Sequence, residues 1–179
     1  MGLNFSSLYS YFFGKEKVKI IMIGLDVSGM TTILYKFKLD KVMPTVPTMG
    51  FNVEEFNHKN VSFVAWDVGM RNSTRLYWKY YFKYAQGLIY VVDSNDRERI
   101  DEARQVLAEA LKEEELHNTV LLVFANKQDL PDAMSTSELT EKLGLRDIKD
   151  RLWHIQPSSG ISGEGLHEGL DWIVSHLNK

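Results

Sequence analysis

The sequence predicts an α/β fold: a doubly wound, mostly parallel sheet with one antiparallel hairpin at an edge. Short apolar runs typical of buried strands alternate along the chain with longer segments of helical periodicity, as in sheets covered by helices. Two strand-like runs flank the turn-forming tripeptide His58-Lys59-Asn60, which indicates the hairpin. With 179 residues, 44% of them hydrophobic, the chain can bury one full core.

The composition narrows the classes of function. The net charge of −3 gives no electrostatic reason to expect a nucleic acid as the main partner. The chain has no cysteine, which excludes a disulfide scaffold, a thiol nucleophile and a thiolate metal site. No apolar run reaches the roughly 18 to 20 residues of a membrane-spanning helix, and the start lacks the positively charged segment of a secretory signal.

Residues 1–17 are expected to form an amphipathic helix and a hinge, followed by one domain over residues 18–179. Gly2 and Ser6 have the spacing of an N-myristoylation signal. Apolar side chains recur behind them at helical spacing, at Phe5, Leu8, Tyr9, Phe12 and Phe13. A single acyl chain binds membranes weakly, so this second apolar element would make attachment effective. The alternative is a terminal helix packed permanently on the domain; we favour the membrane-binding helix because the signals occur together.

The first expected strand, residues 18–23, breaks into a glycine-bounded loop, and a helix is expected over residues 31–39. The pattern G-x-x-x-x-G-K-[ST] binds phosphates because backbone N–H groups and the helix N-terminus converge on them. Its lysine reaches the outer phosphates and its hydroxyl ligates Mg²⁺. Gly24, Gly29 and Thr31 fit this pattern, but the lysine is replaced. The stretch therefore predicts a nucleotide-binding architecture, though not by itself a working hydrolase.

A proline-containing loop without hydrophobic period covers residues 40–50, and the two arms of the hairpin are expected at 51–56 and 61–67. The second arm ends in Asp67, at the place where P-loop proteins put the carboxylate that holds Mg²⁺ through water. An aspartate at a strand end is more often a turn former. An aromatic-rich helix is expected over residues 75–84.

The next buried strand is expected at residues 88–93 and leads into a long helix over residues 97–116. Asn95 and Glu98 have the spacing of a capping box and support a helix start at this point. Another buried strand follows at residues 120–125.

The C-terminal part continues the alternation. Ser135 and Glu138 again have capping-box spacing and predict a helix that Gly144 ends. A short strand at residues 153–156 and a final helix over residues 165–177 close the chain. In such sheets ligands bind beyond the carboxyl ends of the strands, where the glycine-bounded loop lies.

Asn126-Lys127-Gln128-Asp129 follows the strand at residues 120–125 and has the chemistry to select a purine. An aspartate can accept hydrogen bonds from N1–H and the exocyclic amine of guanine, an edge that adenine does not present. The lysine stem can lie along the base, and the asparagine can tie the base to the phosphate loop. Alone the tetrapeptide is a common solvated turn; downstream of a phosphate loop and an acidic strand end, we interpret it as a guanine site.

These residues together resemble the ADP-ribosylation factors, the Arf branch of the small GTPases, from Gly2 to the last helix. The resemblance implies the P-loop small GTPase fold and a switch, controlled by GTP and GDP, on membranes of the secretory pathway. It rests on the N-terminal glycine and helix, Gly24-Leu25-Asp26, Pro47-Thr48-Met49-Gly50-Phe51-Asn52-Val53-Glu54, Trp66-Asp67-Val68-Gly69, Val91-Val92-Asp93-Ser94-Asn95-Asp96-Arg97 and Ala125-Asn126-Lys127-Gln128-Asp129-Leu130-Pro131.

The family's behaviour implies the partners and the location. Its members act in vesicle-mediated protein transport and recruit coats, lipid-modifying enzymes and tethers. The GTP state releases the N-terminal helix into the bilayer while the strand pair around residues 51–67 slides in register. We therefore expect a cytoplasmic protein that associates reversibly with Golgi or other secretory membranes, with guanine nucleotide, a membrane surface and effector and regulator proteins as partners.

Carried over residue by residue, the resemblance makes Thr31 and Thr48 ligands of Mg²⁺, with Asp67 holding the ion through water. The backbone N–H of Gly160, in the turn after Ser159, would meet the guanine oxygen. The full nucleotide set is Gly24, Asp26, Val27, Ser28, Gly29, Met30, Thr31, Thr32, Gly69, Met70, Asn126, Lys127, Asp129, Ser159 and Gly160.

Three aromatic residues match the triad through which the family contacts effectors: Phe51, Trp66 and Tyr81. Most such side chains are core residues. Phe51 and Trp66 lie on the strand pair that must be partly uncovered, so we favour surface recognition.

The departures from the family gather on the γ-phosphate side of the site. Met30 replaces the lysine, Met70 the glycine that lets the backbone approach the γ-phosphate, and Arg71 the glutamine that orients the attacking water. A lost charge-assisted contact costs on the order of 1.5 to 3 kcal/mol. Val27-Ser28 adds bulk where the family has two alanines. We expect very slow or absent hydrolysis and assign no catalytic residue; Arg71 stands at the position that orients the water.

Three accounts follow. The protein can still be a nucleotide switch, with Arg71 swinging towards the phosphates to supply the charge that Met30 lacks. It can be a pseudo-GTPase that binds GDP or nothing and acts as an interaction module. It can also be a hydrolysing GTPase, which ranks last because three contacts would need replacement. We favour the switch over the module because the guanine and Mg²⁺ residues remain.

Overall fold

The computed structural model describes residues 16–39, 51–59, 61–68 and 78–177. Several predictions fall outside these residues and stay predictions: the N-terminal helix with Gly2, the metal ligand Thr48, and the segment with Gly69, Met70 and Arg71. Within the described part of the chain, no helix has the length and apolar character needed to cross a membrane.

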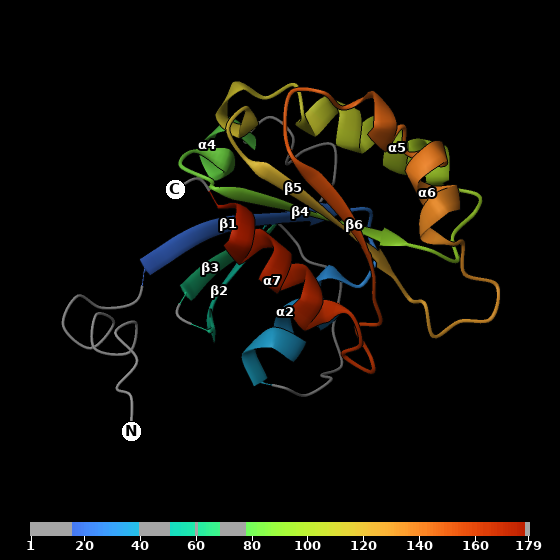
Figure 1. The fold of residues 1–179 in the computed structure, drawn as a ribbon, viewed down its shortest axis with the longest axis horizontal. Coiled ribbons are helices and arrows are strands. Elements are labelled where there is room, and N and C mark those ends of the chain that lie inside the picture. Colours follow the sequence, from blue (N-terminus) through green and yellow to red (C-terminus); the bar gives the residue numbers. More distant parts are fainter. Residues whose placement is uncertain (1–15, 40–50, 60, 69–77, 178–179) are drawn as a thin grey trace.

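A twisted central sheet carries the fold, and in the described residues its strand order is β2-β3-β1-β4-β5-β6 (Figure 1). The antiparallel pair of β2 and β3 forms the edge, and the other neighbouring strands are parallel. This confirms the predicted doubly wound sheet with one edge hairpin. The strands are β1 (Glu16–Gly24), β2 (Phe51–His58), β3 (Val61–Val68), β4 (Gly87–Asp93), β5 (Val120–Asn126) and β6 (Trp153–Pro157).

Helices cover both faces of the sheet. One layer contains α2 (Met30–Leu39) and α7 (Leu166–His176), and the other contains α4 (Trp78–Phe82), α5 (Ile100–Ala110) and α6 (Thr136–Lys142) (Figure 1). Two short 3-10 helices, η1 (Glu114–Leu116) and η2 (Leu145–Asp147), follow α5 and α6.

The alternation of β1 explains the two layers. Ile20 and Met22 belong to the apolar cluster under α2 and α7, whereas Ile21 and Ile23 belong to the cluster under α4, α5 and α6. All four side chains are fully buried. Successive residues of a strand point to opposite faces, so the part of β1 that is covered on both sides, residues 20–23, is apolar at every position.

The predicted helix over residues 97–116 is wrong at both ends. Its start is Ile100, and the predicted capping box of Asn95 and Glu98 does not form: the N-cap is Arg99, with no side-chain cap bond. Asp96 Oδ1 instead accepts from the backbone N–H of Arg99 at 3.2 Å. Helix α5 ends at Ala110, after which 3-10 bonds tighten the chain.

The other expected boundaries agree more closely with the structure. Ser135 is the N-cap of α6 and accepts from the backbone N–H of Glu138 at 3.2 Å, as predicted. Gly144 follows α6 in the left-handed region, with a φ of 68°. Of the helix expected over residues 75–84, the described part is α4. These elements place the carboxyl ends of β1, β3, β4 and β5 at one edge of the sheet.

Candidate nucleotide-binding site

The loop between β1 and α2 turns tightly at this edge. A Cβ atom on Gly24 would lie 2.3 Å from the carbonyl oxygen of Val91. Gly29 has a φ of +96°, and a Cβ atom on it would lie 2.4 Å from Asn126 Nδ2. Both positions therefore require glycine. The N–H of Ile33 donates to the carbonyl oxygen of Gly29 at 3.0 Å, so the helix starts directly from the loop and its N-terminus can hold an anion.

Val27 occupies a strained position in this loop. Its φ is 65°, a region that a β-branched residue rarely adopts, and its side chain is 69% exposed. Packing gains therefore do not explain the conformation. Strain of this kind persists only where the surrounding structure imposes it, and strained residues are concentrated at functional sites.

Met30 is buried among apolar side chains. It is 7% exposed and belongs to the apolar cluster between the sheet and the layer of α2 and α7, together with Ile33 and Leu34 of the same helix. A lysine in the pattern directs an ammonium group at the outer phosphates. At this position the chain instead contributes apolar core and no positive charge.

Thr31 and Asp67 are brought together as the Mg²⁺ hypothesis requires. The Thr31 hydroxyl donates to Asp67 Oδ2 at 2.7 Å, and Asp67 is fully buried at the end of β3. A hydroxyl and a carboxylate are the hard oxygen ligands that Mg²⁺ prefers, so this pair fits the ion. The third predicted ligand, Thr48, lies outside the described residues.

Asn126 joins the end of β5 to two other segments. Its Nδ2 donates to the carbonyl oxygen of Ser28 in the phosphate loop at 2.8 Å, and its Oδ1 accepts from the backbone N–H of Gly160 at 2.9 Å. Asn126 is 2% exposed. One buried amide thus connects the phosphate loop, the expected guanine-reading segment and the turn after β6.

The hydrogen bond from Gly160 bears on its predicted role. Its backbone N–H, which the resemblance assigns to the guanine oxygen, is engaged by Asn126. A contact from this N–H to a guanine would share the donor between two acceptors. Ser158 and Ser159 in the same turn are each 2% exposed. The turn is therefore buried beside Asn126, and the role of Gly160 stays a prediction.

Lys127 and Asp129 follow Asn126 at the surface of the same edge. Lys127 has a φ of 66°, and its Nζ lies 2.6 Å from Asp93 Oδ2 at the end of β4. Asp129 is exposed, as a carboxylate that meets a ligand must be. No role is predicted for Asp93 from the sequence, although its place at the end of an expected strand is the kind of signal that identified Asp67.

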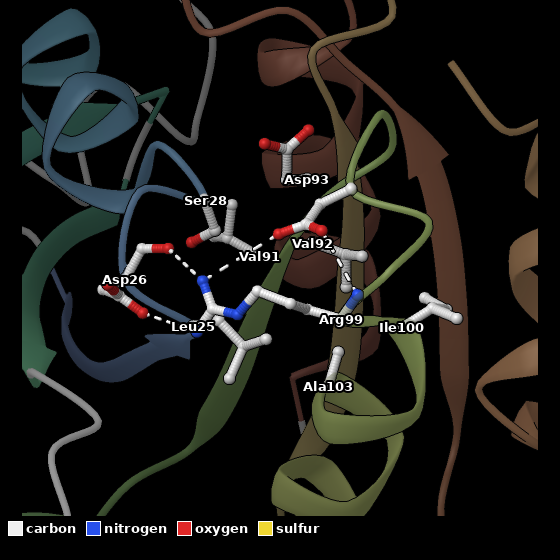
Figure 2. A pocket seen from close by; sticks show the side chains of 10 residues that line it. Leu25, Asp26, Ser28, Val91, Val92, Asp93, Arg99, Ile100 and Ala103 are labelled. Carbon is white, nitrogen blue, oxygen red and sulfur yellow. Dashed lines mark hydrogen bonds and ion pairs between the residues drawn. The ribbon is translucent and has the colours of Figure 1, made fainter. Parts of the chain in front are cut away.

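A small pocket lies beside the phosphate loop, between the ends of β1 and β4 and the start of α5 (Figure 2). Arg99 borders it and extends towards Asp26 in the loop, whose Oδ1 lies 2.6 Å from Arg99 Nη2. Hydrogen bonds that the Arg99 guanidinium donates to Glu102 and Asp26 raise its pKa. The apolar floor of the pocket includes Leu25, Val91, Val92, Ile100 and Ala103. The sequence predictions do not include Arg99.

The described part of the predicted effector triad is half-buried. The rings of Trp66 and Tyr81 have centroids 6.1 Å apart, and both pack against the core on the α5 side. Lys19 Nζ lies 4.5 Å from the centre of a Trp66 ring, and burial lowers the pKa of Lys19. Phe51 begins β2, but its side chain is outside the description. The two rings therefore combine a structural role with a partly exposed surface.

Taken together, the loop after β1, the acidic end of β3 and the turn after β5 define a P-loop nucleotide-binding protein of the small-GTPase type. The chain belongs to the ADP-ribosylation factor family, whose model matches residues 5–177. It is also similar to the solved structure of the Arl6 BBS3 small GTPase from Trypanosoma brucei with the bound nucleotide analogue GppNp. The sequences are 34% identical, the TM-score is 0.82, and the match covers 89% of this chain and 96% of that one.

Proposed function

We propose that this Arf-family chain is a guanine-nucleotide-controlled switch in intracellular vesicle trafficking, with weakened γ-phosphate contacts and little intrinsic hydrolysis. The observation that carries the proposal is the pair of hydrogen bonds of Asn126, which ties the phosphate loop to the turn after β6. The Thr31–Asp67 contact supports an Mg²⁺ ion next to the same loop. The residues proposed to select the base and to bind the metal therefore lie at one edge of the sheet.

The chain's own residues divide the work of binding. Asp129 is exposed and would accept hydrogen bonds from guanine, while the Lys127 stem would lie along the base. Thr31 would contribute its hydroxyl to Mg²⁺, and Asp67 would orient the ion's water. Mg²⁺ supplies charge neutralisation of the phosphates when it is bound.

The buried Met30 is the reason for expecting weak γ-phosphate contacts. A lysine at this position would make a charge-assisted contact worth about 1.5 to 3 kcal/mol, or roughly ten- to a hundredfold in affinity. Hydrolysis would suffer in addition from Met70 and Arg71 if they act where the resemblance places them. Arg71 would partly compensate if it swings towards the phosphates.

The membrane part of the proposal comes from the N-terminal segment. Gly2 would carry the acyl chain, and the apolar stripe behind it would bind a Golgi or other secretory membrane. Effectors and regulators of the coat, exchange-factor or tether type would contact the surface that includes Trp66 and Tyr81. The family match and the described GTPase core support this role.

The test is the thermal midpoint of the purified chain with Mg²⁺ and GDP, GTP or no nucleotide. A ligand present at 100 times its Kd stabilises the folded state by about 2.7 kcal/mol. For a chain of this size we expect a rise of roughly 5 to 10 °C. Stabilisation by both nucleotides supports the switch. Stabilisation by GDP alone indicates a locked state, and by neither it indicates the interaction module.

Two controls show that such a shift reports guanine in the proposed site. ATP at the same concentration should not raise the midpoint, because adenine does not offer the edge that Asp129 would bind. Asp129→Asn should lose the shift, whereas Asp132→Asn removes a neighbouring exposed carboxylate and should keep it. Phosphate release from GTP no faster than in buffer would support the expected lack of hydrolysis.

A further inference from the structure

Arg99 connects the phosphate loop to the start of α5 (Figure 2). Its Nη2 donates to Asp26 Oδ1 at 2.6 Å, and its Nη1 donates to the backbone carbonyl oxygen of Asp26 at 3.5 Å. On the helix side, Nε donates to Glu102 Oε2 at 2.9 Å, and Nη1 lies 3.9 Å from Asp96 Oδ2. The guanidinium is thus held both by the loop and by carboxylates at the beginning of α5.

We propose that Arg99 is a positioning residue of the phosphate loop, which neutralises Asp26 and thereby sets how strongly the loop holds a polyphosphate. The inference rests on the proposed function, because it concerns the same site. It adds Arg99, from the start of α5, to the residues of the site, and it predicts that the charge of Asp26 weakens phosphate binding.

The charges around the loop explain why this pair matters. Asp26 places a carboxylate within the loop that is expected to bind phosphate anions, and Met30 brings no positive charge to the same loop. Like charges at close range disfavour one another. Without Arg99, the Asp26 carboxylate would repel an incoming phosphate. The repulsion grows with the number of phosphate charges, so GTP should be affected most and GMP least.

Solvent limits the size of the effect. The side chain of Asp26 is 65% exposed and that of Arg99 is 34% exposed, so water and salt screen the pair. An exposed ion pair contributes little, and we therefore expect changes of about two- to fivefold in GTP affinity. These changes should shrink as the ionic strength rises.

A purely structural role would have a different signature. Arg99 also bonds to the backbone of Asp26 and so anchors the loop to α5. If anchoring were its only role, Arg99→Ala would lower the affinities for GMP, GDP and GTP by the same factor. The loss of affinity would also be the same whether or not residue 26 carries a charge.

The experiment measures the dissociation constants of GMP, GDP and GTP in Mg²⁺ by calorimetry on the full chain. The variants are Asp26→Asn, Arg99→Ala, Arg99→Lys and the double variant Asp26→Asn with Arg99→Ala. The matched control is Arg97→Ala, because this neighbouring arginine pairs with Glu138 at 2.7 Å, away from the loop.

We expect Asp26→Asn to bind GTP about two- to fivefold more tightly, with smaller gains for GDP and GMP. Arg99→Ala should weaken the binding of GTP most and that of GMP least, and Arg99→Lys should recover part of the lost affinity. In the double variant, the Arg99 change should have little further effect, and Arg97→Ala should match the wild type. Equal losses for all three nucleotides, or an undiminished loss in the double variant, would overturn the inference.

Failure of the proposed function can be told apart from failure of this inference. If the wild type binds no guanine nucleotide but Asp26→Asn does, the inference holds and the natural chain is not a switch. If neither binds, both are wrong. If the wild type binds but the variants show no dependence on phosphate number, only the inference is overturned.

Discussion

Replacement of Asn126 by alanine is expected to lower the free energy of unfolding of the nucleotide-free chain by about 2 to 4 kcal/mol. The amide makes two hydrogen bonds, to the carbonyl oxygen of Ser28 at 2.8 Å and from the N–H of Gly160 at 2.9 Å. Ser28, Asn126 and Gly160 are all buried. Each partner left unsatisfied in a buried site costs about 1 to 3 kcal/mol, and water entering beside the loop recovers part of that cost.

The assay is equilibrium unfolding in urea without nucleotide, followed by circular dichroism. In a thermal scan the same loss corresponds to a fall of roughly 5 to 15 °C for a chain of this size. Gln105→Ala is the matched control, because Gln105 is exposed on α5 and, among the described residues, its amide donates only to Glu109, at 3.0 Å. That variant should change the free energy of unfolding by less than about 0.5 kcal/mol.

A loss below about 1 kcal/mol for Asn126→Ala would refute this reasoning, because two buried hydrogen bonds cannot then connect the loop to the turn. The same variant also tests the link to function. If the bridge prepares the site for guanine nucleotide, the stabilisation by GDP should be smaller than in the wild type at the same ligand concentration. An unchanged GDP effect would mean that the bridge serves the fold alone.

Three further predictions concern the loop and the hairpin. Met30→Lys should raise GTP affinity by roughly tenfold or more, as measured by calorimetry. It should also lower the free energy of unfolding in urea, because a charge enters a position that is only 7% exposed. Val27→Gly should raise the free energy of unfolding by about 1 kcal/mol, since glycine adopts a φ of 65° without strain, and a loss of stability would contradict this. Hydrogen bonds from Lys59, and to a smaller extent from His58, lower the pKa of the Asp171 carboxyl, so the folded state binds fewer protons there than the unfolded state. The resulting stability is present above about pH 4 and is lost as the pH falls through the folded pKa. Asp171→Asn should therefore flatten the acid limb of unfolding stability against pH, and an unchanged limb would refute the assignment.

The sequence predicts most of the fold because the signals are local. The apolar residues of β1 and the alternation of elements fix a covered parallel sheet, and Ser135 with Gly144 marks the limits of α6. The start of α5 is different. Asn95 and Glu98 have the spacing of a capping box, but Asp93 Oδ1 accepts from the backbone N–H of Asn95, and Asp96 Oδ1 accepts from that of Arg99. A spacing rule does not show which of several polar side chains wins such a competition.

The site is predictable where one short segment supplies the chemistry. The glycines of the loop, the threonine after it and the acidic end of β3 all lie in the places that the motifs indicate. Arg99 could not be identified in this way, because its partner Asp26 lies 73 residues away. The pairing of Lys127 with Asp93 likewise depends on the registration of β4 beside β5. Such side-chain pairs become visible only when the strands are placed.

The two ends of the site differ in how they are held, and this bears on switching. At the proposed base end, Asn126 is buried and makes two hydrogen bonds, so the segment expected to bind guanine is connected to the loop before any ligand binds. At the phosphate end, Met30 packs into the core and the nearby Arg99 is occupied by carboxylates. A ligand shifts a conformational equilibrium only through contacts that differ between the two states. Since GDP and GTP share the base, any discrimination must arise at the phosphate end. Met30 contributes no charge there, so discrimination between GDP and GTP must depend on how other residues balance the negative charge of Asp26.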